Sequence, residues 1–164
     1  TCVGQGTTFR VFLPADGQPG DEAAAVSSPA LPRGRGELVL IVDDEAHVGD
    51  VAAAILTRHG YRTLTCRDGV EAVTVFAERR TEIQVVVSDV NMPILDGPAL
   101  TVVLRRLRPD VPILTMTGLD DRGAAPAAEP AEFTMTIRKP FTAETLLTAL
   151  HRVRHGEPAA AAVR

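Results

Sequence analysis

The feature that most restricts the fold of this chain is a run of five apolar residues, Leu38–Val42, followed directly by a stretch with helical spacing. An unbroken apolar run of this length is typical of a strand that is covered on both faces, as in a parallel sheet. From Val48 to Leu56 apolar residues recur at the spacing of one helix face, and Gly60 marks the end of that helix. This part of the chain therefore predicts a strand and a helix that packs on it.

The same alternation of strand and helix continues along the chain. Four further strands are expected at 61–65, 84–88, 111–116 and 133–137, and further helices around 70–77, 100–107 and 146–153. A fourth helix, expected between 119 and 130, would be short or irregular because Pro126 and Pro130 limit it to a turn or two. Five such units predict an α/β fold, a doubly wound parallel sheet with helices on both faces.

Polar residues follow the expected strands at their carboxyl ends. Asp43 and Asp44 follow the first strand, Asp89 follows the third, Thr117 follows the fourth and Lys139 follows the fifth. Ligands of open parallel sheets bind outside the carboxyl ends of the strands. We therefore expect these five side chains to converge on one edge of the sheet.

Three carboxylates at one edge need a compensating charge. Two unit charges about 4 Å apart repel by roughly 4 kcal/mol at an effective dielectric constant near 20. Mg²⁺ would offset this, because it is bound by one or two carboxylates together with waters and phosphate oxygens, and Lys139 would add a donor to any phosphate held there. The alternative is that the acids cap helices or lie solvated in loops, which is common for a single Asp. The five positions together favour a cation and phosphate site.

Composition excludes several other classes of function. Hydrophobic residues make up 45% of the 164 residues and charged residues 23%, as in an ordinary globular domain. The net charge of −4 gives no electrostatic reason to expect nucleic acid or an anionic membrane as a partner. Cys2 and Cys66 are too few for a disulfide framework, and no segment has the length of a membrane span or the apolar core of a signal peptide. A cytoplasmic location is expected.

The chain divides by composition into four parts. Residues 1–14 hold a Gly-rich turn and an alternating strand pattern, and residues 15–36, rich in Gly, Pro, Ala and Ser, read as a flexible linker. Residues 37–155 form the compact part, and residues 156–164 are expected to be a disordered tail. Because the chain begins with Thr, we expect it to be a piece of a longer protein.

Four segments in the compact part match one family in order and spacing. They are IVDDE with Asp43 and Asp44, SDVNMPILDG with Asp89, ILTMTG with Thr117, and IRKPF with Lys139; the Met-Pro and Asp-Gly pairs of the second segment also fall in the expected places. On these residues, 37–155 resembles the receiver domain of two-component response regulators. The resemblance implies a flavodoxin-like five-stranded sheet of order 2-1-3-4-5.

The resemblance also implies a role for each site residue. Asp89 would accept a phosphoryl group from a phosphohistidine on a histidine kinase or a histidine phosphotransfer domain. Asp44 and Asp89 would ligate Mg²⁺ directly, Asp43 would act through water, and the backbone carbonyl of Asn91 would complete the protein ligands. Thr117 and Lys139 would bind the phosphate oxygens.

One position departs from the family pattern. The residue three before Lys139 is Thr136, where the family carries a Phe or Tyr that takes part in switching. Phe133, the nearest upstream aromatic residue, is expected on the opposite face of the strand from Thr136. Aromatic switching in its usual form is therefore not expected.

The first fourteen residues add a second resemblance. GQGTTFRVFLP is similar to the end of the ATP-binding domain of a sensor histidine kinase, which implies that the chain is the C-terminal receiver of a hybrid histidine kinase. The fragment itself would catalyse its own phosphorylation but would not bind ATP productively. Two alternatives remain open: a degenerate receiver that serves as a binding scaffold, and an aspartyl-phosphate phosphatase, although the latter needs a D-x-D pair where this chain has Asp43-Asp44.

Overall fold

The computed structural model describes residues 31–118 and 134–156, together with Arg10. The chain divides into two units, residues 1–30 and residues 31–164, and the second contains all of the described secondary structure. None of the helices in the described part of the chain has the length and apolarity that a bilayer crossing requires.

Strands and helices alternate along the second unit, as the sequence predicts. In chain order they are β1 (Leu38–Val42), α1 (Ala46–Arg58), β2 (Arg62–Cys66), α2 (Gly69–Arg79), β3 (Ile83–Asp89), α3 (Gly97–Leu107), β4 (Ile113–Thr117), β5 (Thr134–Arg138) and α4 (Ala143–Arg154). The expected strand positions are confirmed with shifts of one or two residues at their ends. The short fourth helix expected between 119 and 130 lies outside the described residues.

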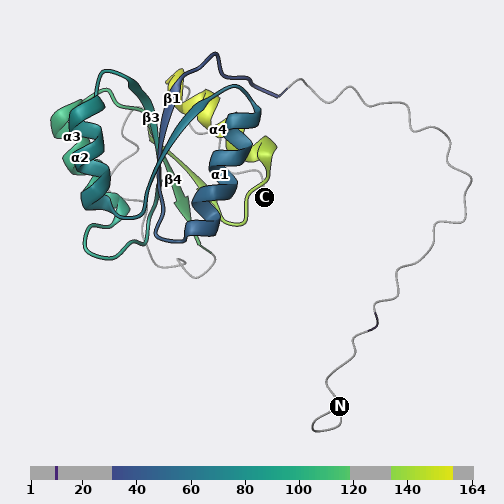
Figure 1. The fold of residues 1–164 in the computed structure, drawn as a ribbon, viewed down its shortest axis with the longest axis horizontal. Helices are drawn as coiled ribbons and strands as arrows, with labels where there is room; N and C mark the ends of the chain where they lie inside the picture. Colours follow the sequence, from purple (N-terminus) through teal and green to yellow (C-terminus); the bar gives the residue numbers. More distant parts are fainter. Residues whose placement is uncertain (1–9, 11–30, 119–133, 157–164) are drawn as a thin grey trace, which may run out of the picture. The chain divides into compact units, whose positions relative to one another are not determined.

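The five strands form one parallel sheet of order β2-β1-β3-β4-β5. This order confirms the predicted flavodoxin-like fold. Of the described helices, α2 and α3 lie on one face of the sheet, and α1 and α4 lie on the other (Figure 1). Because β1 lies inside the sheet, between β2 and β3, its residues are covered on both faces, which accounts for its fully buried run.

The two faces of the sheet bury separate apolar clusters. On the side of α1 and α4, Leu56 and Leu150 pack on residues such as Ile41. On the side of α2 and α3, Phe76 and Leu104 complete the second cluster. The helices begin at defined residues, because the side chains of Asp68, Asp96 and Thr142 each accept a hydrogen bond from a backbone N–H three residues later.

A short segment ahead of the first strand belongs to the same unit. The N–H of Gly34 donates to the carbonyl of His59 at 2.8 Å, and the N–H of Gly36 donates to the carbonyl of Gly60 at 2.8 Å. Leu31 packs against the cluster on the α1 side. The residues from Leu31 to Gly36, which the sequence places in a linker, thus lie against the turn between α1 and β2.

Gly34 offers a test of this contact. A Cβ added there would lie 2.7 Å from the ring of Tyr61 and 2.9 Å from the carbonyl oxygen of Gly60, too close for either to accommodate without movement. We expect Gly34→Ala to lower the free energy of unfolding by about 1–3 kcal/mol, measured by urea denaturation. Arg35→Ala is the control because the Arg35 side chain is exposed. Equal stability of the two variants would show that the segment does not pack as described.

Candidate functional site

The sheet register brings the carboxyl ends of four strands together. Val42, the last residue of β1, pairs with Ser88 of β3, and Asp89 pairs with Met116 of β4. Thr117 at the end of β4 pairs with Arg138 at the end of β5. Residues that follow these positions, including Asp43, therefore lie at one edge of the sheet, as predicted.

The Lys139 ammonium lies between two buried carboxylates. Its Nζ atom is 2.9 Å from Oδ2 of Asp43 and 3.1 Å from Oδ2 of Asp89. The side chain of Asp43 is fully buried and that of Asp89 is 8% exposed, while Lys139 is 13% exposed. Buried charges are stable only when they are paired, so this contact holds the three side chains in place.

Burial and charge perturb all three groups. Burial raises the pKa of Asp43 above its usual value, and the contact with Lys139 opposes this only in part. Burial also raises the pKa of Asp89, and the nearby charge of Asp43 adds to the effect. Burial alone would lower the pKa of Lys139, but its contacts with the two carboxylates outweigh burial and raise that pKa. Such shifts in one cluster are typical of functional sites.

Backbone groups of neighbouring residues also hold Asp89, the candidate phosphoacceptor. Oδ1 of Asp89 accepts a hydrogen bond from the N–H of Val90 at 2.9 Å. The N–H of Gly97 donates to the carbonyl of Val90 at 2.9 Å, which draws the start of α3 against the end of β3. A Cβ at Gly97 would lie 2.4 Å from the carbonyl oxygen of Asp89, so only glycine fits this position. The close packing of α3 against the end of β3 therefore requires the glycine in SDVNMPILDG.

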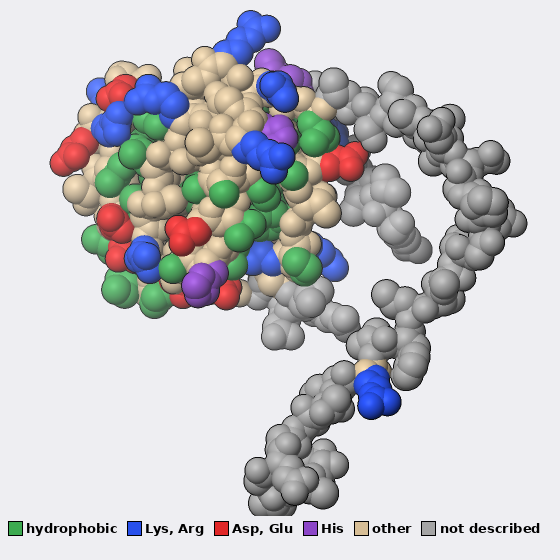
Figure 2. All heavy atoms as spheres, turned by 45° about the vertical axis from the view of Figure 1, so that its right-hand side comes forward, with side chains coloured by type: hydrophobic (Ala, Val, Ile, Leu, Met, Phe, Trp, Pro, Cys, Tyr) green, Lys and Arg blue, Asp and Glu red, His purple; other side chains and the backbone are tan. Residues whose placement is uncertain are grey.

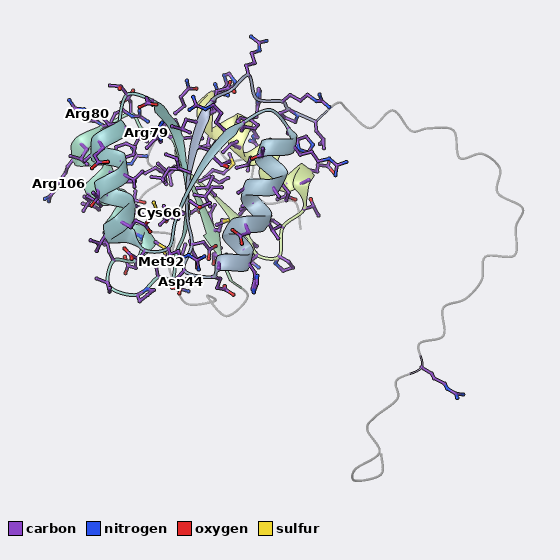
Figure 3. The ribbon with its side chains drawn as sticks, in the orientation of Figure 1. Asp44, Cys66, Arg79, Arg80, Met92 and Arg106 are labelled. Carbon is purple, nitrogen blue, oxygen red and sulfur yellow. The ribbon has the colours of Figure 1, made fainter. Side chains whose placement is uncertain are left out.

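The other predicted site residues lie around this centre. Thr117 is half-buried at the end of β4, and its carbonyl accepts a 2.8 Å hydrogen bond from the N–H of Lys139. Asn91 is exposed in the loop after β3. Asp44 is exposed beside Asp43, at the same end of the molecule as Met92 and at the opposite end from Arg79 and Arg80 (Figure 3).

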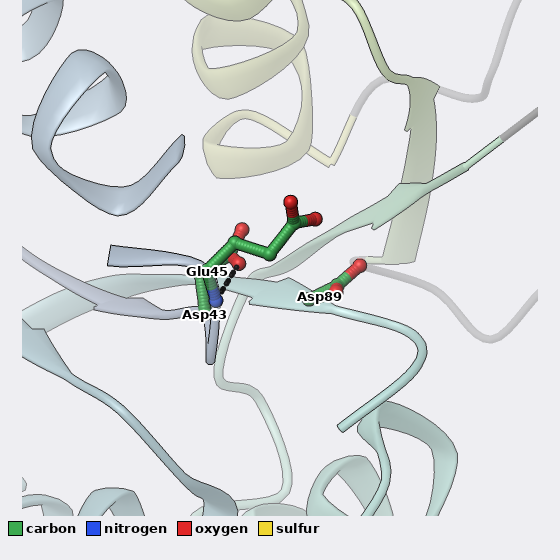
Figure 4. Close-up of side chains that lie close together, drawn as sticks. All are labelled: Asp43, Glu45 and Asp89. Carbon is green, nitrogen blue, oxygen red and sulfur yellow. Dashed lines mark hydrogen bonds between the residues drawn. The ribbon is translucent and has the colours of Figure 1, made fainter. Parts of the chain in front are cut away.

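Glu45 is the site residue that sequence reasoning did not single out. Oxygen atoms of Asp43, Glu45 and Asp89 all lie within 4.8 Å of one another (Figure 4). Oε1 of Glu45 is 3.6 Å from Nζ of Lys139. The N–H of Glu45 also donates to Oδ1 of Asp43 at 2.9 Å. Its place directly after Asp43-Asp44 was the available signal, but an exposed Glu at the start of a helix is usually solvated.

The donor atoms of this group suit a hard cation. All are carboxylate oxygens, the ligands that Mg²⁺ prefers. Oδ2 of Asp43 is buried, and the Lys139 ammonium 2.9 Å away compensates its charge. A cation that reached Asp43 and Asp89 would therefore find oxygens whose charge is only partly balanced. The residues present fit Mg²⁺.

Comparison with known proteins agrees with this geometry. Residues 39–151 match the family model described as the response regulator receiver domain. The sensor kinase CckA of Brucella abortus is 34% identical over 156 residues, covering 90% of this chain and 16% of that protein. The response regulator MprA of Mycobacterium sp. (strain KMS) is 36% identical over 112 residues, covering 68% of this chain and 48% of that protein. The chain thus spans less than half the length of these relatives.

Solved structures show the same fold. A response regulator receiver domain from Clostridium thermocellum superposes with a TM-score of 0.66 at 28% identity, covering 72% of this chain and 94% of the other. The receiver domain of the hybrid histidine kinase CckA superposes with a TM-score of 0.60 at 29% identity, covering 71% and 98%.

The crowded acids predict a stability effect of known sign. Because the folded-state pKa of Asp89 is raised, the folded state holds the proton more tightly than the unfolded state, and stability is lost as pH rises through that pKa. We expect Asp89→Asn, which carries no charge, to raise Tm at pH 7 on the order of 3 °C. The gain should shrink as the pH falls toward about 4, near the unfolded-state pKa.

The measurement is thermal unfolding in the presence of EDTA from pH 4 to 8. Asp110→Asn removes an acid whose side chain is 79% exposed and should leave Tm almost unchanged. A wild-type protein as stable as Asp89→Asn at every pH would show that Lys139 fully balances both buried acids.

Proposed function

The chain belongs to the response regulator receiver domain family, and on that premise we propose that it accepts a phosphoryl group on Asp89 in a two-component phosphorelay. The observation that carries the proposal is the placement of Lys139 between Asp43 and Asp89 at the carboxyl edge of the sheet. This arrangement supplies a nucleophilic carboxylate, an acidic partner and a cationic donor at one point.

The proposed reaction is a transfer between two protein side chains. A carboxylate oxygen of Asp89 attacks the phosphorus atom of a phosphohistidine, a P–O bond forms and the P–N bond breaks. The leaving imidazole takes up a proton, and Asp89 becomes an acyl phosphate. The chain's contribution is positioning and charge neutralisation, because phosphoryl transfer requires little other covalent chemistry.

Each neighbouring residue has a part in this proposal. Asp44 and Asp89 would hold Mg²⁺ directly, Asp43 would act through water and the carbonyl of Asn91 would complete the set. Mg²⁺ supplies neutralisation of the charge that gathers on the phosphate oxygens. Lys139 already lies 3.1 Å from Asp89 and would donate to a phosphate oxygen.

Thr117 would be the second donor to the phosphate. It ends the strand that pairs with β3 on one side and β5 on the other, and its backbone carbonyl is bonded to Lys139. Thr136 of β5, the position that departs from the family pattern, pairs with Thr115 of β4, and their hydroxyl oxygens lie 2.7 Å apart. A hydroxyl pair therefore occupies the β4–β5 surface where the family carries an aromatic switch residue.

Intact-mass spectrometry after incubation with acetyl phosphate tests the proposal. We expect a gain of one phosphoryl group that requires Mg²⁺ and is lost completely in Asp89→Asn. Asp50→Asn is the matched control, because it removes an exposed carboxylate on α1 and should keep full incorporation. No incorporation into the wild type from acetyl phosphate or from a phosphorylated histidine kinase would favour the scaffold alternative.

We also propose that the chain is the receiver part of a hybrid histidine kinase. Residues 39–151 make up about two thirds of the chain and only 13 residues follow them, so an alignment covering 90% of the chain extends well into the N-terminal segment. The relative in that alignment is a sensor kinase. On this proposal residues 1–14 close an ATP-binding domain, residues 15–36 connect it to the receiver, and the phosphodonor is reached in cis or in trans.

The test uses the parent polypeptide with radiolabelled ATP. Label should pass from a base-stable phosphohistidine to a base-labile acyl phosphate in the wild type. It should remain on histidine when Asp89 is replaced by Asn. A parent polypeptide that shows no ATP-dependent labelling would contradict the hybrid-kinase proposal and leave the receiver chemistry untouched.

A further inference from the structure

Glu45 differs from the other acids of the site in exposure. Its side chain is 66% exposed, whereas those of Asp43 and Asp89 are almost completely buried. Its carboxylate contacts Lys139 at 3.6 Å, a longer distance than either buried acid makes. Glu45 is therefore anchored through its backbone N–H on Asp43 but carries its charge at the open side of the site.

This position gives the Glu45 charge two opposite effects. A divalent cation that enters the site meets one more negative charge within 4.8 Å of its candidate ligands, which strengthens binding. A small anionic phosphodonor that approaches Asp89 from solvent meets the same charge, which slows its approach. The two effects share one cause, so they must change together when the charge is removed.

We propose that Glu45 is a positioning residue that sets the balance between cation affinity and access of anionic phosphodonors. It does so by holding a negative charge beside the Lys139 ammonium at the mouth of the site. The expected effect on phosphodonors rests on the proposed function, whereas the expected effect on cation affinity concerns the unphosphorylated protein alone. Glu45 makes no bond to the transferred phosphorus and acts through charge.

Glu45→Gln isolates the charge from the rest of the side chain. The amide has nearly the same size, and the backbone N–H that donates to Asp43 is retained. The matched control is Glu78→Gln, which removes an equal charge from an exposed position on α2. Both variants thus have the same net charge, so a difference between them reports position.

The first measurement is Mn²⁺ binding to the metal-free, unphosphorylated protein, followed by electron paramagnetic resonance of the free ion. We expect Glu45→Gln to raise the Kd for Mn²⁺ about 3- to 10-fold, the range for one partly screened charge at this distance. The difference in Kd between Glu45→Gln and the wild type should be smaller at 0.5 M NaCl, because salt screens the Glu45 charge. Glu78→Gln should bind Mn²⁺ as the wild type does.

The second measurement is the rate of phosphorylation by acetyl phosphate at saturating Mg²⁺. We expect Glu45→Gln to react about 2- to 5-fold faster than the wild type, because the donor is an anion. A residue that only braced the loop would lower both cation affinity and rate when changed, or alter neither.

The outcomes separate the two proposals. Unchanged Mn²⁺ affinity in Glu45→Gln, or a rate that falls together with affinity, overturns the role of Glu45. A wild type that binds no Mn²⁺ also overturns it. A wild type that binds Mn²⁺ more tightly than Glu45→Gln but takes up no phosphate supports the role of Glu45 in cation affinity and counts against phosphoryl transfer at Asp89.

Discussion

The ion contact of Lys139 with Asp43 and Asp89 is the interaction on which the rest of this site depends. Two carboxylates that are almost free of solvent cannot remain ionised side by side without a cation within reach. Nζ of Lys139 lies 2.9 Å from Asp43 and 3.1 Å from Asp89. These two are the buried acids among the described residues. The raised pKa values of both acids show that this balance is incomplete. The negative charge of the two acids is therefore not fully neutralised by Lys139, which would favour binding of a cation beside a phosphoacceptor.

The fold delivers this contact through its register. β1 and β3 are neighbours in the centre of the sheet, so Asp43 and Asp89 leave adjacent strands at the same height. Lys139 comes from the far edge strand, and its N–H is bonded to the carbonyl of Thr117, which carries its side chain back over β4 toward the acids. The position of Gly97 against the carbonyl of Asp89 keeps the start of α3 close to the end of β3. Sequence positions about 100 residues apart thus meet because the strand order places β5 next to β4 and β4 next to β3.

Much of this was predictable from sequence because the controlling patterns are local. The apolar run of β1 and the helical spacing that follows it fixed the class of fold, and the rule on strand ends selected Asp43, Asp89 and Lys139. Exposed or long-range features were not predictable. Glu45 reaches the site only through a flexible side chain, and no local pattern distinguishes it from a solvated Glu at a helix start. The packing of residues 31–36 on the α1–β2 turn depends on Gly34 lying against Tyr61, two positions that no periodic pattern connects. Ile94 is another case, since an exposed β-branched residue at φ 69° runs against the backbone preference that sequence reasoning relies on.

The proposed phosphoryl transfer would require the charges at the site to rearrange. Lys139 occupies the region where positive charge is most needed, so an added cation and a phosphate would have to share Asp43 and Asp89 with it or draw it to a new acceptor. Asp43 and Asp89 are buried, whereas Glu45 is exposed and the Lys139 side chain has four rotatable bonds. On the proposed function, Glu45 and Lys139 are therefore the side chains expected to rearrange, and the backbone hydrogen bonds of the sheet edge would be kept. In the proposed transfer, buried Asp43 and Asp89 would keep their places at the sheet edge while the Lys139 ammonium turns toward the incoming phosphate oxygens.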